Sequence, residues 1–166
     1  QKATDIKQRE NAIQYLCYTY RENDNEKALH YARLAGKRGE TPVGAVIVRK
    51  GEIVSWGYNT RETAKNAIRH AEITAIDRAC KRLGGWRLWE CEMYVTLEPC
   101  PMCAGAILNS RIKEVYFGAY DEKYGCFGTA MNLSFPGGFH TPRIIGGYMT
   151  EPCEELLRDF FSQLRK

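Results

Sequence analysis

The sequence contains no long apolar run. None of the hydrophobic stretches in its 166 residues approaches the ~20 residues that a membrane-spanning helix requires, and no signal-peptide pattern opens the chain. We therefore expect no membrane partner. The first residue is Gln rather than Met, so we expect the start to have been trimmed or processed. There is also no internal repeat, low-complexity tract or linker that would split the chain.

A paired set of cysteines is also missing. The seven Cys are odd in number, and most are scattered along the chain: Cys17, Cys80, Cys91, Cys100, Cys103, Cys126 and Cys153. This pattern argues against a disulfide framework and predicts a reducing, cytoplasmic location. If two of these residues bind a metal, the other five are most simply small apolar residues.

The chain has no strong excess of one charge. Its net charge of +4 is compatible with a nucleic-acid substrate, but many cytosolic proteins are equally basic. We expect most basic clusters to be solvated faces, and about a third of them to touch phosphate if the substrate is a polynucleotide. The clusters are Arg61, Lys65 and Arg69; Lys81, Arg82 and Arg87; Arg111 and Lys113; and Arg165 and Lys166.

Two short motifs carry residues that typically bind a metal. The first is His70-Ala71-Glu72, and the second is Pro99-Cys100-Pro101-Met102-Cys103. One His and two Cys supply three ligands, which is the number that a catalytic zinc uses when its fourth position stays open to water. The sequence therefore predicts a zinc site formed by His70, Cys100 and Cys103.

The spacing of the motifs also predicts where helices start. Residues two apart do not share a helix face, so His70 and Glu72 can converge on one metal only if a helix begins there. Cys100 and Cys103 are three apart and share a face in the first turn of their helix. We expect two helix N-termini to face one metal, because their unpaired N–H groups and partial positive ends favour thiolates.

Glu72 is the predicted proton carrier. Zinc lowers the pKa of a bound water, and a carboxylate beside that water can take its proton and later deliver it. Such a residue needs a pKa above that of free Glu, which a dry pocket would supply. Other interpretations of the Cys-x-x-Cys pair are a redox site or half of a structural zinc site, although His30 and His140 lack a matching spacing.

The hydrophobic pattern predicts an α/β fold. The order of elements indicates a three-layer α/β/α arrangement, in which helices cover both faces of a mixed five-stranded sheet. We expect residues 1–25 to form an N-terminal extension, an extra helix, and residues 26–166 to form a single domain. Expected helices cover residues 3–20, 69–83, 101–109 and 152–166, with a short one near 128–133. Another helix should begin at a cap at Asp24 or Asn25 and end at Gly36. Expected strands cover residues 43–49, 52–58, 93–97, 114–119 and 143–148, with polar breaks at 21–25 and 60–67 and a tight turn at Lys50-Gly51.

Several longer motifs point to a known family. They are Glu40 to Val46, Tyr58-Asn59, His70-Ala71-Glu72-Ile73, Tyr94 to Ile107, Ser110-Arg111-Ile112 and Phe117 to Asp121. From Pro42 to the end, the chain resembles the tRNA adenosine deaminases of the bacterial wobble-editing type, within the cytidine/deoxycytidylate deaminase-like superfamily. The motif Val-Thr-Leu-Glu-Pro-Cys, followed by Ala-Gly-Ala and Ser-Arg-Ile, favours the tRNA branch over free-base guanine deaminases.

The resemblance implies a reaction and a set of contacts. One zinc per subunit would be held by His70, Cys100 and Cys103, Glu72 would move protons, and hydrolysis at C6 of an extruded adenine would release ammonia and leave inosine. The implied substrate is the wobble position of a tRNA anticodon loop, for instance that of an arginine tRNA, bound by a homodimer. The implied base contacts are Asn59, Pro42, Val43, Ala71, Leu97 and Glu98, and the implied RNA contacts are Arg69, Arg111, Asp121, Phe139 and His140.

The chain also departs from that family pattern. Asn66-Ala67-Ile68-Arg69 stands where bacterial relatives have Asp-Pro-Thr-Ala, and Phe139 stands where they have Asn before His140. Two alternative functions share the zinc motif. One is a small-molecule deaminase acting on guanine or a nucleoside. The other is a non-catalytic zinc subunit that binds tRNA or a partner, against which the presence of Glu72 argues.

Overall fold

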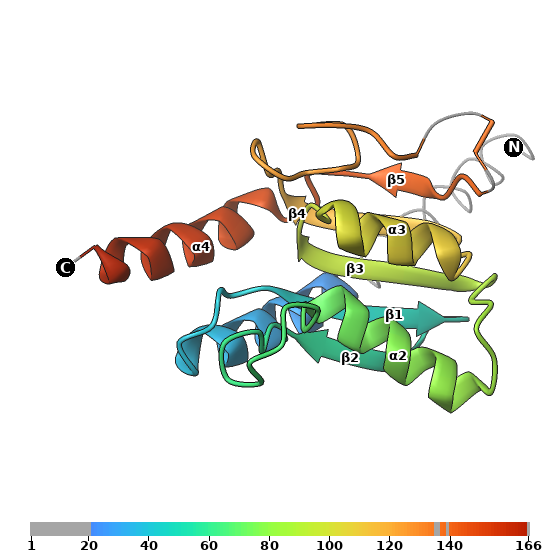
Figure 1. The fold of residues 1–166 in the computed structure, drawn as a ribbon, viewed down its shortest axis with the longest axis horizontal. Helices are drawn as coiled ribbons and strands as arrows, with labels where there is room; N and C mark the ends of the chain where they lie inside the picture. Colours follow the sequence, from blue (N-terminus) through green and yellow to red (C-terminus); the bar gives the residue numbers. More distant parts are fainter. Residues whose placement is uncertain (1–20, 135–136, 139, 166) are drawn as a thin grey trace, which may run out of the picture.

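The structure is a computed structural model that describes residues 21–134, 137–138 and 140–165 (Figure 1). The helix expected over residues 3–20 lies outside these residues. No helix in the described ranges is long and apolar enough to cross a bilayer.

A five-stranded mixed sheet forms the centre of the molecule, as the sequence predicts. Its strand order is β2-β1-β3-β4-β5, with β1 antiparallel to β2 and β3, and with β3, β4 and β5 parallel. The strands are β1 Gly44–Arg49, β2 Glu52–Tyr58, β3 Cys91–Leu97, β4 Glu114–Ala119 and β5 Arg143–Ile145. The turn at Lys50 and Gly51 is confirmed, with φ values of 51° and 78°.

Helices cover both faces of the sheet, which confirms the three-layer arrangement. In Figure 1, α2 and α3 lie in front of the sheet and the blue helix of residues 21–37 lies behind it. The other helix, α4, follows β5 and extends beyond the sheet. The helix bounds are α2 Ala71–Leu83, α3 Pro101–Asn109 and α4 Thr150–Leu164.

The alternation of side chains along β1 creates the two cores. Ala45 and Ile47 belong to the cluster under α2 and α3, whereas Val46 and Val48 join Ala28 of the helix 21–37 on the other face. Successive strand residues point to opposite faces, so an uninterrupted apolar run is needed where both faces are covered. Each fully buried Ile or Val side chain stabilises the fold by about 1.5–3 kcal/mol.

Two glycines allow helices to approach the sheet closely. A Cβ atom on Gly44 would collide with the backbone of the helix 21–37 at Ala28, and one on Gly57 would collide with the backbone of α2 at Ala71. Gly57 therefore sets the depth at which the first turn of α2 lies on β2. That turn carries the His-x-Glu motif.

Two predictions about local structure are wrong. Residues 21–25 do not break the chain, because they are helical and continuous with the helix to residue 37. Asn25 is fully buried, and its Nδ2 donates to the carbonyl of Tyr148 over 2.8 Å. No helix forms at residues 128–133, where turns surround a single bridge between Phe127 and Asn132. The last strand is also shorter than expected and ends at Ile145.

Strand β2 lies at one edge of the sheet, and α2 covers part of that edge. Arg78 Nη1 donates to the carbonyl of Trp56 over 2.9 Å, and Arg82 Nη1 donates to the carbonyl of Val54 over 3.2 Å. The Arg78 guanidinium also lies 4.0 Å from the centre of the Trp56 ring. Both arginines come from the exposed side of a helix that otherwise packs on the core.

Candidate metal centre

The two metal-binding motifs lie at helix N-termini, as their spacing predicts. His70 is the N-cap of α2 and Cys100 is the N-cap of α3, and both have extended backbone conformations. Pro101 follows in the first position of α3, where its missing N–H leaves no bond unmade. Neither side chain makes a capping hydrogen bond, and both the imidazole and the thiol face the site.

Three potential ligand atoms meet between these helix ends. His70 Nδ1 lies 3.6 Å from Cys100 Sγ and 3.5 Å from Cys103 Sγ, and the three ligand atoms lie within 4.8 Å of one another. Two sulfurs and one imidazole nitrogen form the donor set of zinc rather than that of magnesium or calcium. Cys103 is fully buried, while His70 and Cys100 are partly exposed toward the pocket. The residues present thus fit a zinc ion with one side open.

The electrostatics of the cluster favour a bound cation. Hydrogen bonds from Cys103 and then His70 lower the pKa of Cys100 to about 4, so this residue is a thiolate at neutral pH. The bond to Cys100 and burial raise the pKa of Cys103, and the same Cys100 raises the pKa of His70. A bound divalent metal would take the place of these shared protons, because a coordinating thiol is deprotonated by the ion.

Glu72 lies in the first turn of α2, beside the three ligands. Its side chain is 4% exposed, and burial raises the pKa of its carboxyl. A carboxyl that is buried beside a cation site and opens to a pocket can hold a proton and release it again. This is the environment that the sequence predicts for this residue.

A pocket of about 560 Å³ opens above the cluster. Of the residues predicted to contact substrate, Val43, Asn59, Leu97, Glu98 and Asp121 line it. Pro42 and Ala71 are buried but do not line the pocket, and neither do Arg69, Arg111 and His140. Phe139 lies outside the described residues. The imidazole of His140 instead lies 2.7 Å from the carbonyl of Ile112.

The sequence interpretation missed other residues of the pocket. Arg61 lines it, although it was assigned only to a general basic cluster. The aromatic rings of Tyr120, Tyr124 and Phe161 line it too, and all three are about half exposed. An exposed aromatic residue in a loop after a strand is a signal that could have identified the first two.

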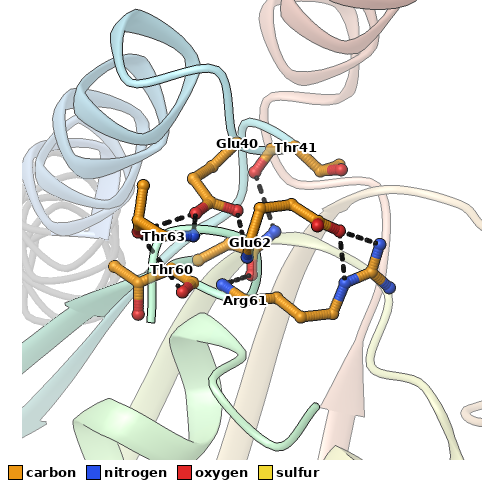
Figure 2. A network of polar contacts seen from close by, with 7 residues as sticks. Glu40, Thr41, Thr60, Arg61, Glu62 and Thr63 are labelled. Atoms are coloured by element: carbon orange, nitrogen blue, oxygen red, sulfur yellow. Dashed lines mark hydrogen bonds and ion pairs between the residues drawn. The ribbon is translucent and has the colours of Figure 1, made fainter. Parts of the chain in front are cut away.

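Residues 59–69, which we call the first wall, form one side of the pocket. Figure 2 shows the carboxylate of Glu40 pointing at this wall from the segment before β1. Glu40 accepts hydrogen bonds from the N–H of Glu62 over 3.1 Å and from the N–H and hydroxyl of Thr63 over 2.7 and 2.8 Å. Glu40 is 1% exposed, whereas Glu62 and Thr63, which donate to it, are exposed residues.

Residues 120–134, which we call the second wall, form the opposite side. Glu98, also 1% exposed, accepts hydrogen bonds from the N–H groups of Asp121, Phe127 and Thr129 over 3.1, 3.1 and 3.2 Å. Although Glu98 lines the pocket, both of its carboxylate oxygens are thus bonded to the backbone of the second wall. A Cβ atom on Gly125 would collide with this carboxylate.

Comparison with known proteins identifies the group to which the chain belongs. Residues 20–119 match the family described as the cytidine and deoxycytidylate deaminase zinc-binding region. The chain is 49% identical over 142 residues to the tRNA-specific adenosine deaminase of Bacillus subtilis (strain 168), which covers 85% of this chain and 88% of that protein.

Solved structures agree with that assignment. A structure from a study of A-to-I editing by tRNA:A34 deaminases at the wobble position of transfer RNA is 39% identical, with a TM-score of 0.76 over 81% of this chain and 99% of its own. The guanine deaminase of Bacillus subtilis is 32% identical, with a TM-score of 0.60 over 87% of this chain and 94% of its own. Together with the His/Cys/Cys cluster, these similarities show that the chain belongs to the tRNA-specific adenosine deaminases of the zinc-binding cytidine and deoxycytidylate deaminase family, with zinc as its cofactor.

Proposed function

We propose that this protein is a zinc-dependent hydrolase that converts adenosine to inosine at the wobble position of tRNA and releases ammonia. The observation that carries the proposal is the buried Glu72 beside the His70, Cys100 and Cys103 cluster, at the floor of a pocket in a chain that is 49% identical to a tRNA-specific adenosine deaminase.

In this proposal His70, Cys100 and Cys103 hold the metal, one ion per subunit. Bound zinc supplies Lewis-acid activation of a water molecule for hydrolysis. Two thiolates and a neutral imidazole nearly balance the charge of the ion, so the site needs a separate group to accept the proton of that water. The first turns of α2 and α3 direct their N–H groups toward these anionic ligands, which favours the charged form of both sulfurs.

Glu72 is the proposed acid and base. Because burial raises its pKa, its carboxyl can hold the proton taken from water and deliver it to a ring nitrogen. It can then carry a second proton, from the hydroxyl group added at C6, to the amino group, which leaves as ammonia. The residue comes directly after Ala71 in the first turn of α2, and Gly57 fixes the height of that turn above β2. This arrangement holds Glu72 beside the three metal-binding residues.

Asn59 is the proposed contact to the edge of the base. Its Oδ1 accepts the N–H of Arg61 over 3.1 Å, and its Nδ2 donates to the carbonyl of Thr41 over 3.4 Å. A side-chain amide has two N–H donors, so one remains for a purine nitrogen. Val43 and Leu97 supply apolar surface for the ring of a base that has been extruded from its neighbours.

The rim of the pocket suits a polynucleotide. Tyr120 and Tyr124 are 50% and 53% exposed, and rings in such positions can stack on the bases that flank the target. Arg61 supplies a positive charge at the same rim. Further proposed RNA contacts are Arg69, Arg111, Asp121, Phe139 and His140. We also propose that the protein is a cytoplasmic homodimer that binds the anticodon loop of its tRNA substrates, one of which is an arginine tRNA.

The test is deamination of a defined tRNA. Incubation with an arginine tRNA that has an ACG anticodon should yield inosine at the first anticodon position, read by mass spectrometry of nuclease digests. Glu72→Gln serves as the matched control and should retain zinc but give no inosine. A wild-type protein that leaves this tRNA unchanged while deaminating guanine or cytidine would disprove the assignment.

One observation favours a second candidate. The guanine deaminase of Bacillus subtilis is 32% identical to this chain, and the match covers 87% of it. A free purine base is therefore the competing substrate. The exposed aromatic rim distinguishes the two candidates, because a free base has no flanking nucleotides to stack there. Tyr124→Ala should therefore weaken tRNA turnover, whereas it should leave guanine turnover unchanged if guanine is the substrate.

A further inference from the structure

The first wall depends on a residue that lies outside the pocket. All residues from 61 to 69 are exposed, so the wall contributes no side chain to the cores. Several of its hydrogen bonds close turns within the wall, as from Ala64 to Thr60 and from Asn66 to Arg61. Glu40 lies on a different segment and accepts three hydrogen bonds at the tip of the wall.

The charge of Glu40 is maintained by these bonds. Burial alone would raise the pKa of this carboxyl, but the donors of Thr63 and Glu62 hold its pKa below the ordinary value. Glu40 is therefore an anion that accepts charge-assisted hydrogen bonds, which are about twice as strong as neutral ones. Both carboxylate oxygens of Glu40 are bonded to the first wall, and the metal cluster is formed by other residues.

The segment that contains Glu40 and Thr41 contacts the turn at residues 59–63 at both of its ends. Next to Glu40, the carbonyl of Thr41 accepts the Nδ2 of Asn59 over 3.4 Å, and the Oδ1 of Asn59 accepts the N–H of Arg61 over 3.1 Å. Figure 2 shows Glu40 and Thr41 side by side above the turn that carries Arg61. Thr41, Asn59 and Arg61 all line the pocket, while Glu40 does not.

We propose that Glu40 is a positioning residue for substrate binding: its carboxylate fixes the turn at Thr60 to Thr63, and this turn places Asn59 and Arg61 where they meet the nucleotide. Glu40 acts only through these residues and takes no part in the proton transfers. The choice of substrate in the assay rests on the proposed function, whereas the effect of Glu40 on the wall does not.

The decisive variant is Glu40→Gln, which keeps the shape of the side chain and removes its charge. Its amide group would face the N–H groups of Glu62 and Thr63, so at least one bond is lost. We expect KM for the ACG-anticodon tRNA to rise about tenfold or more, which corresponds to ~1.4 kcal/mol, while kcat changes by less than about threefold and the zinc content stays at one per chain. Such a split indicates lost ground-state positioning rather than lost chemistry.

Two further variants make the comparison sharper. Glu40→Asp keeps the charge on a shorter side chain and should recover part of the wild-type KM, which a purely steric role would not predict. Glu52→Gln makes the same chemical change at an exposed position beside the hairpin turn, at the other end of β1 and β2, and should leave KM and kcat unchanged.

A second measurement does not depend on activity. Hydrogen exchange at the amides of Glu62 and Thr63 should accelerate at least tenfold in Glu40→Gln, whereas the amides of β3 should keep their protection. If exchange there is unchanged, or if KM is unchanged while the variant binds full zinc, the inference is wrong. If wild-type protein fails to deaminate tRNA but exchange accelerates as expected, the proposed function fails and the positioning role stands.

Discussion

The first wall, residues 59–69, and the second wall, residues 120–134, are each fixed by one buried carboxylate, Glu40 and Glu98. Each carboxylate accepts three hydrogen bonds, of which two or three come from backbone N–H groups. The walls differ in what else holds them. The second wall places Cys126 and Phe127 in the main core, whereas residues 61–69 of the first wall are all exposed.

This difference separates two consequences of losing a buried anion. Where the wall is part of the core, the freed N–H groups stay away from water, so the loss destabilises the fold. Where the wall is exposed, water can reach the freed groups, so the loss chiefly loosens the pocket. Glu98 should therefore matter more for stability, and Glu40 more for substrate binding.

Removing zinc should have the largest effect, because the metal site joins the two walls. His70 follows the first wall directly, and Cys100 lies two residues after Glu98. A ligand that binds only the folded state stabilises it by about 4 kcal/mol at 1,000 times its Kd. Chelation should lower the unfolding temperature by roughly 10 °C and abolish deamination, and added zinc should restore both. An unfolding temperature that calorimetry finds unaffected by chelation would contradict this.

Glu98→Ala should rank second. It leaves three N–H groups of the second wall without an acceptor, and two of them, at Phe127 and Asp121, lie in buried or half-buried residues. We expect a loss of about 3 kcal/mol in the free energy of unfolding, measured by urea titration. Glu122→Ala, an exposed position on the same wall, is the control and should change stability by no more than about 0.5 kcal/mol.

Truncating one apolar side chain on each wall tests the comparison most directly. Phe127 is 8% exposed and belongs to the core, whereas Ile68 is 55% exposed. Phe127→Ala should cost about 3 kcal/mol through lost burial and a residual cavity, and Ile68→Ala should cost less than about 0.5 kcal/mol. Equal losses in paired urea titrations would mean that the first wall is packed as firmly as the second.

Glu62→Gln should give the smallest effect. Its side chain pairs with Arg61 over 2.9 Å, but the two groups are 70% and 52% exposed. Exposed ion pairs contribute little because solvent and salt screen them, so stability should change by less than about 0.5 kcal/mol in a thermal melt at two salt concentrations. The backbone N–H of residue 62 still reaches Glu40 in this variant. A larger loss would show that the exposed pair, and not the buried anion, fixes the first wall.

The sequence predicted the metal cluster and most of the sheet because their signals are local. The spacing of His70 and Glu72 predicts one helix start and that of Cys100 and Cys103 predicts another, and the structure has His70 and Cys100 as N-caps. The strand residues alternate between two cores, and a run of apolar residues such as 45–48 in β1 contributes to both. Such features depend on neighbours in the chain.

The errors and omissions arise from contacts between distant segments. Asn25 resembles a helix cap, but its amide bonds Tyr148 more than a hundred residues away, so the helix continues through it. Near residues 128–133 the chain is tied to Glu98 through the N–H groups of Phe127 and Thr129. It is not helical there, because Gly128 has a φ of 126° and its N–H donates forward to the carbonyl of Met131. The sequence does not predict a functional role for Glu40, because nothing near it in the chain indicates that its carboxylate accepts a hydrogen bond from Thr63.

The arginines on α2 also influence how this protein behaves when it is crowded by copies of itself. An edge strand presents carbonyls that another chain can use as a template for pairing. On β2, the carbonyls of Val54 and Trp56 already accept hydrogen bonds from Arg82 and Arg78, and a guanidinium covers the Trp56 ring. A foreign strand would have to displace two cations to dock there, so this edge resists the first step of fibrous aggregation.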